Sequence, residues 1–238
     1  MTGFAEIWSY LARDPLLWLT ATLVAYAVGD ALSRAAGRHP LVNPVLLAVA
    51  LLAAGLLATG TAYGTYFEGA KFVHFMLGPA TVALAVPLYA NRRLIRGALW
   101  PMLAALVAGS ATAIVSALAL AKALGVGPET LASLAPKSVT APVAIGVAES
   151  LGGSPTLAAV LVILTGITGA VLAGPVLGLL RIRDLRARGV ATGTAAHGIG
   201  TARAFHESDT AGTFSGVAMG LNALLTAVLA PALLHWFL

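Results

Sequence analysis

The sequence predicts an all-α integral membrane protein with about six full transmembrane helices. Of its 238 residues, 59% are hydrophobic and 10% are charged, whereas charged residues make up about 25% of a typical soluble domain. The apolar residues gather in six runs, over 16–32, 41–62, 72–90, 99–121, 155–180 and 212–238. A helix needs roughly 20 apolar residues to cross a hydrocarbon core. The composition excludes a disordered chain, and runs this long without alternation disfavour a β-barrel.

Basic residues between the runs predict how the chain is oriented. Nine arginines lie in the gaps 33–40, 91–98 and 181–188. Because cytoplasmic loops are enriched in Lys and Arg, we expect all three gaps to face the cytoplasm. The net charge of +5 therefore indicates topology, and we expect no nucleic-acid partner. The run 155–180 begins with the Ser154–Pro155 pair, which is typical of a helix start.

Two further segments, 138–150 and 190–204, are too short and too polar to cross the membrane as regular helices. The orientation above makes each begin and end on one side, so we expect re-entrant or broken helices that enter from opposite faces. Irregular backbone at membrane depth is tolerated where protein or a water-filled cavity satisfies it. The segment pattern predicts an inverted repeat with crossed discontinuous helices, as in transporters. We expect one polytopic membrane domain over 1–238, with N-terminal helices over 1–121 and a second half over 122–238.

The first short segment begins with a polar motif, KSVTAP at 137–142. Pro142 lacks an N–H and frees carbonyl groups nearby, while Lys137 can attract an anion. Alternatively, Lys137 lies at the membrane interface and Pro142 is a simple kink. Glu149 carries a proton, pairs with a basic group or faces the outer surface. The candidate binding residues here are Lys137, Ser138, Val139, Thr140 and Pro142.

The second short segment reads VATGTAAHGIGTARA. In a helix, Thr194, His197 and Thr201 share one face. An ionisable residue inside a membrane protein is costly, and His197 can exchange a proton near neutral pH. Arg203 can hold a carboxylate through two hydrogen bonds. Alternatively, Arg203 pairs with Glu207 and His197 is a satisfied core histidine. The candidate binding residues here are His197, Gly198, Gly200, Thr201 and Arg203.

Other features complete the prediction. Thr81, Thr194 and Asn222 are candidate supporting residues, and the overlapping patterns Gly212-x-x-x-Gly216 and Gly216-x-x-x-Gly220 predict close helix packing. The sequence has no Cys and no enzyme motif, and its histidines are scattered. We expect no enzymatic activity, no cofactor and no metal site.

Two stretches resemble the LrgB/CidB family of antiholin-like membrane proteins: KSVTAPVAIGVAESLGG at 137–153 and GTAAHGIGTARAFHESDTAGTFSGVAMGLNALLTAVLAP at 193–231. FMLGPATVALAVPLY at 75–89 is also similar. The resemblance implies a multi-pass protein of the bacterial inner membrane that regulates murein hydrolase export and cell lysis with a small LrgA/CidA-type partner. It also implies carboxylate movement, because a plastid relative exchanges glycolate and glycerate and bacterial members are linked to pyruvate. Ala141 stands where many relatives are expected to have Thr, which can alter substrate preference.

Our leading hypothesis from the sequence is a homodimeric, elevator-type secondary transporter of glycolate, glycerate, pyruvate or lactate. The two short segments would bind the carboxylate near the midplane through helix N-termini and Arg203 or Lys137. His197 or Glu149 would couple a proton. The alternative is an antiholin-like regulator, for which His197 and Arg203 would be replaceable. A channel is a third hypothesis, with flux that does not saturate.

Overall fold

The computed structural model describes residues 14–39, 42–76 and 92–238, and single residues at 79, 82, 83, 86 and 89. All the regular structure in these residues is helical. The chain divides into two compact units, residues 1–85 and 86–238, and each is described by itself. The all-α prediction is confirmed for the described part of the chain.

Four helices of the described residues are long and apolar enough to cross a membrane. They are α2 (Pro15–Ala35), α8 (Leu99–Ala123), α11 (Pro155–Leu179) and α13 (Asp209–Leu234). These four helices correspond to four of the six predicted runs, and they support a multi-pass membrane protein. The run 41–62 forms α3 (Pro44–Thr59), whose 16 residues are about 24 Å long and fall short of a hydrocarbon core of about 30 Å. Most of the run 72–90 lies outside the described residues.

The apolar helices begin at local capping signals. Asp14, Asn43 and Ser154 each accept a hydrogen bond from a backbone amide of the first turn, and a proline follows each of them. The side-chain oxygen satisfies an amide that has no partner within the helix, and proline fixes a helical φ where no donor is needed. The predicted helix start at Ser154–Pro155 is confirmed.

The first unit contains α2, α3 and α4 (Tyr63–Phe75). Two glycines of these helices allow close approach. A Cβ on Gly29 would overlap the carbonyl oxygen of Pro44, and one on Gly69 would overlap that of Pro15. The ring of Trp18 packs edge-on against Tyr66, with ring centroids 5.9 Å apart. Helix α2 is therefore the centre against which the other two pack.

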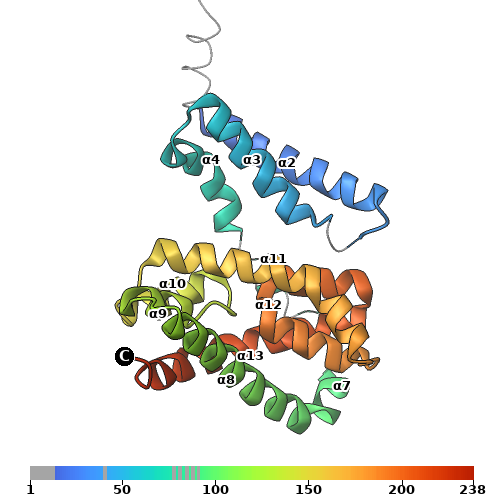
Figure 1. Ribbon diagram of the computed structural model, residues 1–238. Helices are drawn as coiled ribbons and strands as arrows, with labels where there is room; N and C mark the ends of the chain where they lie inside the picture. The colour runs from blue at the N-terminus through green and yellow to red at the C-terminus, as the bar shows by residue number, and fades with distance from the viewer. Residues whose placement is uncertain are drawn as a thin grey trace, which may run out of the picture. The chain divides into compact units, whose positions relative to one another are not determined.

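The second unit is built around α12 (Leu185–Glu207) and α13, which pack along each other (Figure 1). Helices α11 and α8 cover this pair, and three short helices complete the unit. These are α7 (Arg92–Gly97), α9 (Pro128–Leu134) and α10 (Ala141–Ser150). One apolar cluster joins α8 and α9 to the end of α13, and another joins α8 and α12 to its beginning.

Small residues bring α12 and α13 together. A Cβ on Gly189 would overlap the carbonyl oxygen of Ala211, and one on Gly193 would overlap that of Ser215. From α13, Gly212 faces the ring of Phe205. The first predicted glycine pair of α13, Gly212 and Gly216, thus faces α12. The prediction of close packing at Gly220 is wrong, because Gly220 faces open space.

Both short polar segments contain non-helical backbone. Residues 135–140 form turns between α9 and α10, and Thr140 is extended as the N-cap of α10. Helix α12 is interrupted at Ala196 (φ −129°, ψ 15°) and His197 (φ 41°, ψ −135°). The interruption expected within 190–204 is therefore present. The helix begins at Leu185, earlier than predicted, because the side chain of Asp184 caps it.

The close contact between α12 and α13 predicts unequal effects of glycine substitutions. Gly193→Ala places a methyl group against the backbone of Ser215, which cannot move without shifting α13. We expect a loss of at least about 2 kcal/mol of stability, measured as a lower unfolding temperature in detergent. The matched control is Gly220→Ala, which meets nothing and is expected to be neutral or stabilising because alanine favours a helix. Equal effects of the two substitutions would contradict the tight contact.

Candidate functional site

Buried polar side chains gather where the two interrupted segments meet α13. Seven of them, each at most 6% exposed, come from α8, α12, α13 and the turn before α10: Ser110, Ser138, Thr194, His197, Thr201, Ser215 and Asn222. A buried polar group is costly unless it is hydrogen-bonded. Among the described residues, every fully buried side-chain nitrogen and oxygen has a partner, so the cluster is an ordered network.

Asn222 is the centre of this network. Its side chain is fully buried, and its Oδ1 accepts a hydrogen bond from the hydroxyl of Ser110. Its Nδ2 donates to the carbonyl oxygen of Thr194 at 3.1 Å and to that of Ser138 at 3.3 Å. Thr194 lies in the last turn before the break in α12, and Ser138 lies in the turn before α10. One amide therefore holds both non-helical segments against α13 and α8.

The break in α12 places His197 at the surface of α11. Its Nε2 lies 2.9 Å from the carbonyl oxygen of Val162. Because a carbonyl only accepts, Nε2 carries the hydrogen, which leaves Nδ1 as an acceptor in the neutral ring. The carbonyl oxygen of His197 accepts from the hydroxyl of Thr201, and that hydroxyl is 2.9 Å from the hydroxyl of Ser215. The positive φ of 41° at His197 is strained for a residue with a Cβ.

Glycines of α11 make room for the break. A Cβ on Gly166 would overlap the ring of His197, and one on Gly169 would overlap the side chain of Ala196. On the other side of Ala196 lies Gly200, where a Cβ would also collide with the Ala196 methyl group. The broken residues are thus enclosed by three glycines, and the kink depends on all of them being small.

Lys137 brings a positive charge to the same place. Its side chain is half-buried, and Nζ donates to the hydroxyl of Ser138 at 3.2 Å. The ammonium group is close enough to act electrostatically on the ring of His197. No carboxylate of the described residues pairs with Lys137. The site therefore combines a cation, the Ser138 hydroxyl and the start of a half-helix, all of which favour an anion.

The remaining predicted residues differ in where the structure places them. Arg203 is half-buried in the second half of α12, six residues after His197, while Gly198 lies near the sulfur of Met219. Val139 is fully buried in an apolar cluster with Val162. Pro142 and Glu149 are exposed in α10. Thr81 lies outside the described residues. Glu207, the alternative partner suggested for Arg203, forms an ion pair with Arg188 at 2.5 Å.

Four residues of the site were not predicted from the sequence. Ser110 and Ser215 join the polar network, and Gly166 and Gly169 shape the break. The sequence contains a feature that could have identified each pair. A serine within an apolar run needs a hydrogen-bond partner, and two glycines three residues apart permit close approach of another helix.

The chain is similar to known proteins over nearly its whole length. The chain matches the LrgB-like family over residues 22–236. It is 41% identical over 194 residues to the uncharacterized protein YwbG of Bacillus subtilis, covering 82% of this chain and 86% of that protein. It is 32% identical over 222 residues to the holin-like protein CidB of Staphylococcus epidermidis and to that of Staphylococcus aureus, covering 93% of this chain and 96% of each relative. No solved structure matches the chain.

The hydrogen bonds of Asn222 predict a large effect of its removal. Asn222→Leu keeps the branched shape and the number of side-chain heavy atoms but leaves two buried carbonyls and the Ser110 hydroxyl without a partner. We expect a loss of about 3 kcal/mol or more, measured as thermal unfolding in detergent. A double-mutant cycle with Ser110→Ala isolates one contact. Ser110→Ala should lower the free energy of unfolding by about 1 kcal/mol in the wild type and by much less in the Asn222→Leu variant. Equal costs in both backgrounds would contradict the contact.

The strained backbone at position 197 predicts an unusual order of stabilities. His197→Ala and His197→Gly both lose the contact with Val162, but glycine adopts a positive φ without strain. We expect the glycine variant to unfold at a higher temperature, by about 1 kcal/mol of stability. The control is Ala196→Gly, where φ is negative and glycine should destabilise. A less stable His197→Gly variant would argue against the observed break.

Proposed function

The chain belongs to the LrgB-like family, and from this membership we propose that it is an antiholin-like regulator of murein hydrolase export and cell lysis. The observation that carries the proposal is the similarity to proteins named holin-like, which extends over almost the full length of both chains. We propose that the protein lies in the bacterial inner membrane and acts with a small membrane partner of the LrgA/CidA type. Neither an enzymatic step nor a cofactor is needed for this role.

Such a regulator needs surfaces for other membrane helices. In the second unit, large apolar side chains project from α11 at Val160 and Leu164 and from α13 at Leu224 and Val228. These side chains are the sort that pack against lipid or a neighbouring helix. The buried network around Asn222 would then hold the scaffold that presents them. We propose a homodimer as the basic assembly.

We further propose a topology of six crossings within one polytopic domain, with the three arginine-containing gaps in the cytoplasm. The positive-inside rule supports this orientation, and it makes 138–150 and 190–204 two broken segments of an inverted repeat. Because the chain has no Cys, single cysteines can be introduced and labelled from each side. Cysteines at Thr140, which is half-buried, and at Ser150, which is exposed, should report access from the same outer side if the segment is re-entrant. Labelling from opposite sides would make it a crossing helix and overturn the repeat.

A second function is favoured by a specific observation, the break in α12 beside Lys137. A cation without a paired carboxylate, the hydroxyl of Ser138, and Nδ1 of His197 suit a small carboxylate and a coupled proton. We propose as the alternative a secondary carrier of glycolate, glycerate, pyruvate or lactate, with Arg203 as a further cation of the site. Its conformational change would be a movement of one part of the protein against another, as in elevator-type carriers.

One experiment separates the two functions. Purified protein in liposomes is tested for counterflow of labelled glycolate and pyruvate, and cells are tested for release of murein hydrolase with and without the small partner. The regulator predicts no exchange by the protein alone and a release that depends on the partner. Saturable exchange without the partner would favour the carrier. Flux that neither saturates nor runs uphill would indicate a channel.

If the carrier function holds, removing the charge at the break should weaken carboxylate binding. Lys137→Gln is expected to raise the KM for exchange by about tenfold or more, because a hydrogen bond between charged partners contributes about 1.5–3 kcal/mol. The control is Lys122→Gln at the end of α8, whose ammonium group binds the carbonyl oxygen of Phe237 at 2.6 Å and should leave KM unchanged. An unchanged KM for Lys137→Gln would remove Lys137 from the binding site.

A further inference from the structure

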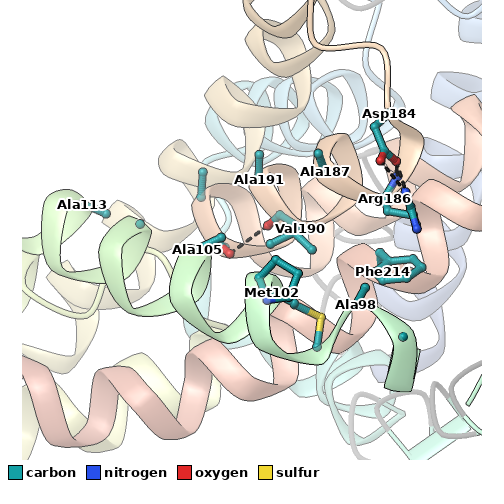
Figure 2. Close-up of a pocket in the computed structure, with 15 residues that line it drawn as sticks. Ala98, Met102, Ala105, Ala113, Asp184, Arg186, Ala187, Val190, Ala191 and Phe214 are labelled. Carbon is teal, nitrogen blue, oxygen red and sulfur yellow. Dashed lines mark hydrogen bonds and ion pairs between the residues drawn. The ribbon is translucent and has the colours of Figure 1, made fainter. Parts of the chain in front are cut away.

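An apolar groove runs between α8 and α12 on the second unit (Figure 2). It has a volume of about 470 Å³. Small residues line it, with Ala105 and Gly109 on α8 and Ala187 and Ala191 on α12. Met102 and Phe214 also line the groove, and both are buried. In Figure 2, Ala113 and Arg186 mark opposite ends of it.

The dimensions of the groove fit an extended hydrocarbon chain. Its lining residues on α8 extend from Pro101 to Ala113, which corresponds to about 18 Å along a helix. The groove is long and narrow and is lined mostly by small apolar residues, which suits one extended acyl chain.

One end of the groove is rich in positive charge. Seven arginines lie close in the chain to the lining residues Gly97 and Arg186 at this end. They belong to α7, to the turn before α12 and to the first turn of α12: Arg92, Arg93, Arg96, Arg181, Arg183, Arg186 and Arg188. A second cavity of about 330 Å³ at the same end of α12 is lined by three of them and Glu207. These seven arginines outnumber the nearby acidic residues, Asp184, Glu207 and Asp209.

The charges at the groove itself stay fixed at physiological pH. The Arg186 side chain and backbone amide bind the carboxylate of Asp184, and these bonds lower the pKa of Asp184 to about 2. Arg186 is therefore partly neutralised, and the positive excess comes mainly from the arginines around it. Arg181 and Arg183 are exposed and form no ion pair with the described residues.

We propose that this groove is a binding site for an anionic phospholipid, with one acyl chain between α8 and α12 and the phosphate at the arginine cluster. Basic sites between membrane helices on the cytoplasmic side bind anionic lipid headgroups. The combination of a narrow apolar groove and a cationic end matches both parts of such a lipid. A zwitterionic lipid matches the groove but gains nothing net from the charge.

The other end of the groove reaches the break in α12. Thr194 lines the groove, and its methyl group faces Gly109 of α8. The carbonyl oxygen of the same residue accepts from Asn222. A bound acyl chain would therefore contact the turn that precedes the break, and lipid occupancy would stabilise the interrupted conformation.

The test measures lipid binding by the purified full-length protein. Native mass spectrometry in mild detergent compares retention of phosphatidylglycerol with phosphatidylcholine of the same acyl chains. We expect preferential retention of phosphatidylglycerol. Ala105→Phe fills the groove and should weaken this binding at least tenfold. Its control is Ala104→Phe, a neighbouring exposed residue that does not line the groove, which should have no effect.

A second pair of variants tests the charge. Arg183→Gln removes an exposed charge that forms no ion pair with the described residues. It should weaken phosphatidylglycerol binding about fivefold, since one basic residue near an anionic headgroup is worth about a factor of five. Lys71→Gln is the matched control, because it removes an exposed cation that does not line the groove. Unfolding temperatures verify that each variant is folded.

Two results would overturn the proposal. One is equal retention of the two lipids by the wild type. The other is unchanged phosphatidylglycerol binding by a folded Ala105→Phe variant, because the acyl chain would then not lie in the groove. Neither result depends on whether the protein regulates a partner or carries a carboxylate.

Discussion

The hydrogen bonds of the Asn222 amide hold the second unit together where its two interrupted segments, the turn before α10 and the break in α12, meet α13. A break inside a membrane-buried helix releases backbone groups that lipid cannot satisfy. Here one side chain donates to the carbonyl oxygens of Ser138 and Thr194 and accepts from Ser110. The tight α12–α13 contact through Gly193 and the enclosure of Ala196 by glycines both require α12 to remain in this position. The polar network and the close packing therefore depend on each other.

Much of the fold could be predicted because length, hydropathy and capping are local properties. The apolar runs and the Ser154–Pro155 start identify α8, α11 and α13 closely, and the glycine-rich, polar composition of 190–204 identifies the break. The network around Asn222 could not be derived in the same way. Ser110 and Ser138 lie 112 and 84 residues from Asn222 in sequence, so no spacing rule brings them together. The sequence identifies Asn222 as a supporting residue but not its partners.

The candidate site, too, could be predicted from the sequence only in part. Lys137, Ser138 and His197 were each chosen for their chemistry, and the structure brings them together through the turn before α10 and the kink in α12. Pro142, Glu149 and Val139 were chosen from the same motif, yet the first two are exposed and the third is core. Where the backbone is irregular, residues that are close in sequence need not belong to the same site. The direction of each side chain follows from dihedral angles that composition does not specify.

The burial of α12 has a consequence for how the protein is made. This helix is not among the four that are apolar enough to cross a membrane, although many of its residues are buried. Its threonines satisfy their hydroxyls on their own helix, as Thr194 does on Val190, and its glycines fit against α13. Neighbouring protein, and not lipid, therefore stabilises α12. During synthesis its principal partner, α13, leaves the ribosome after it. Final placement of α12 must wait for that later segment, which makes it a late step of assembly.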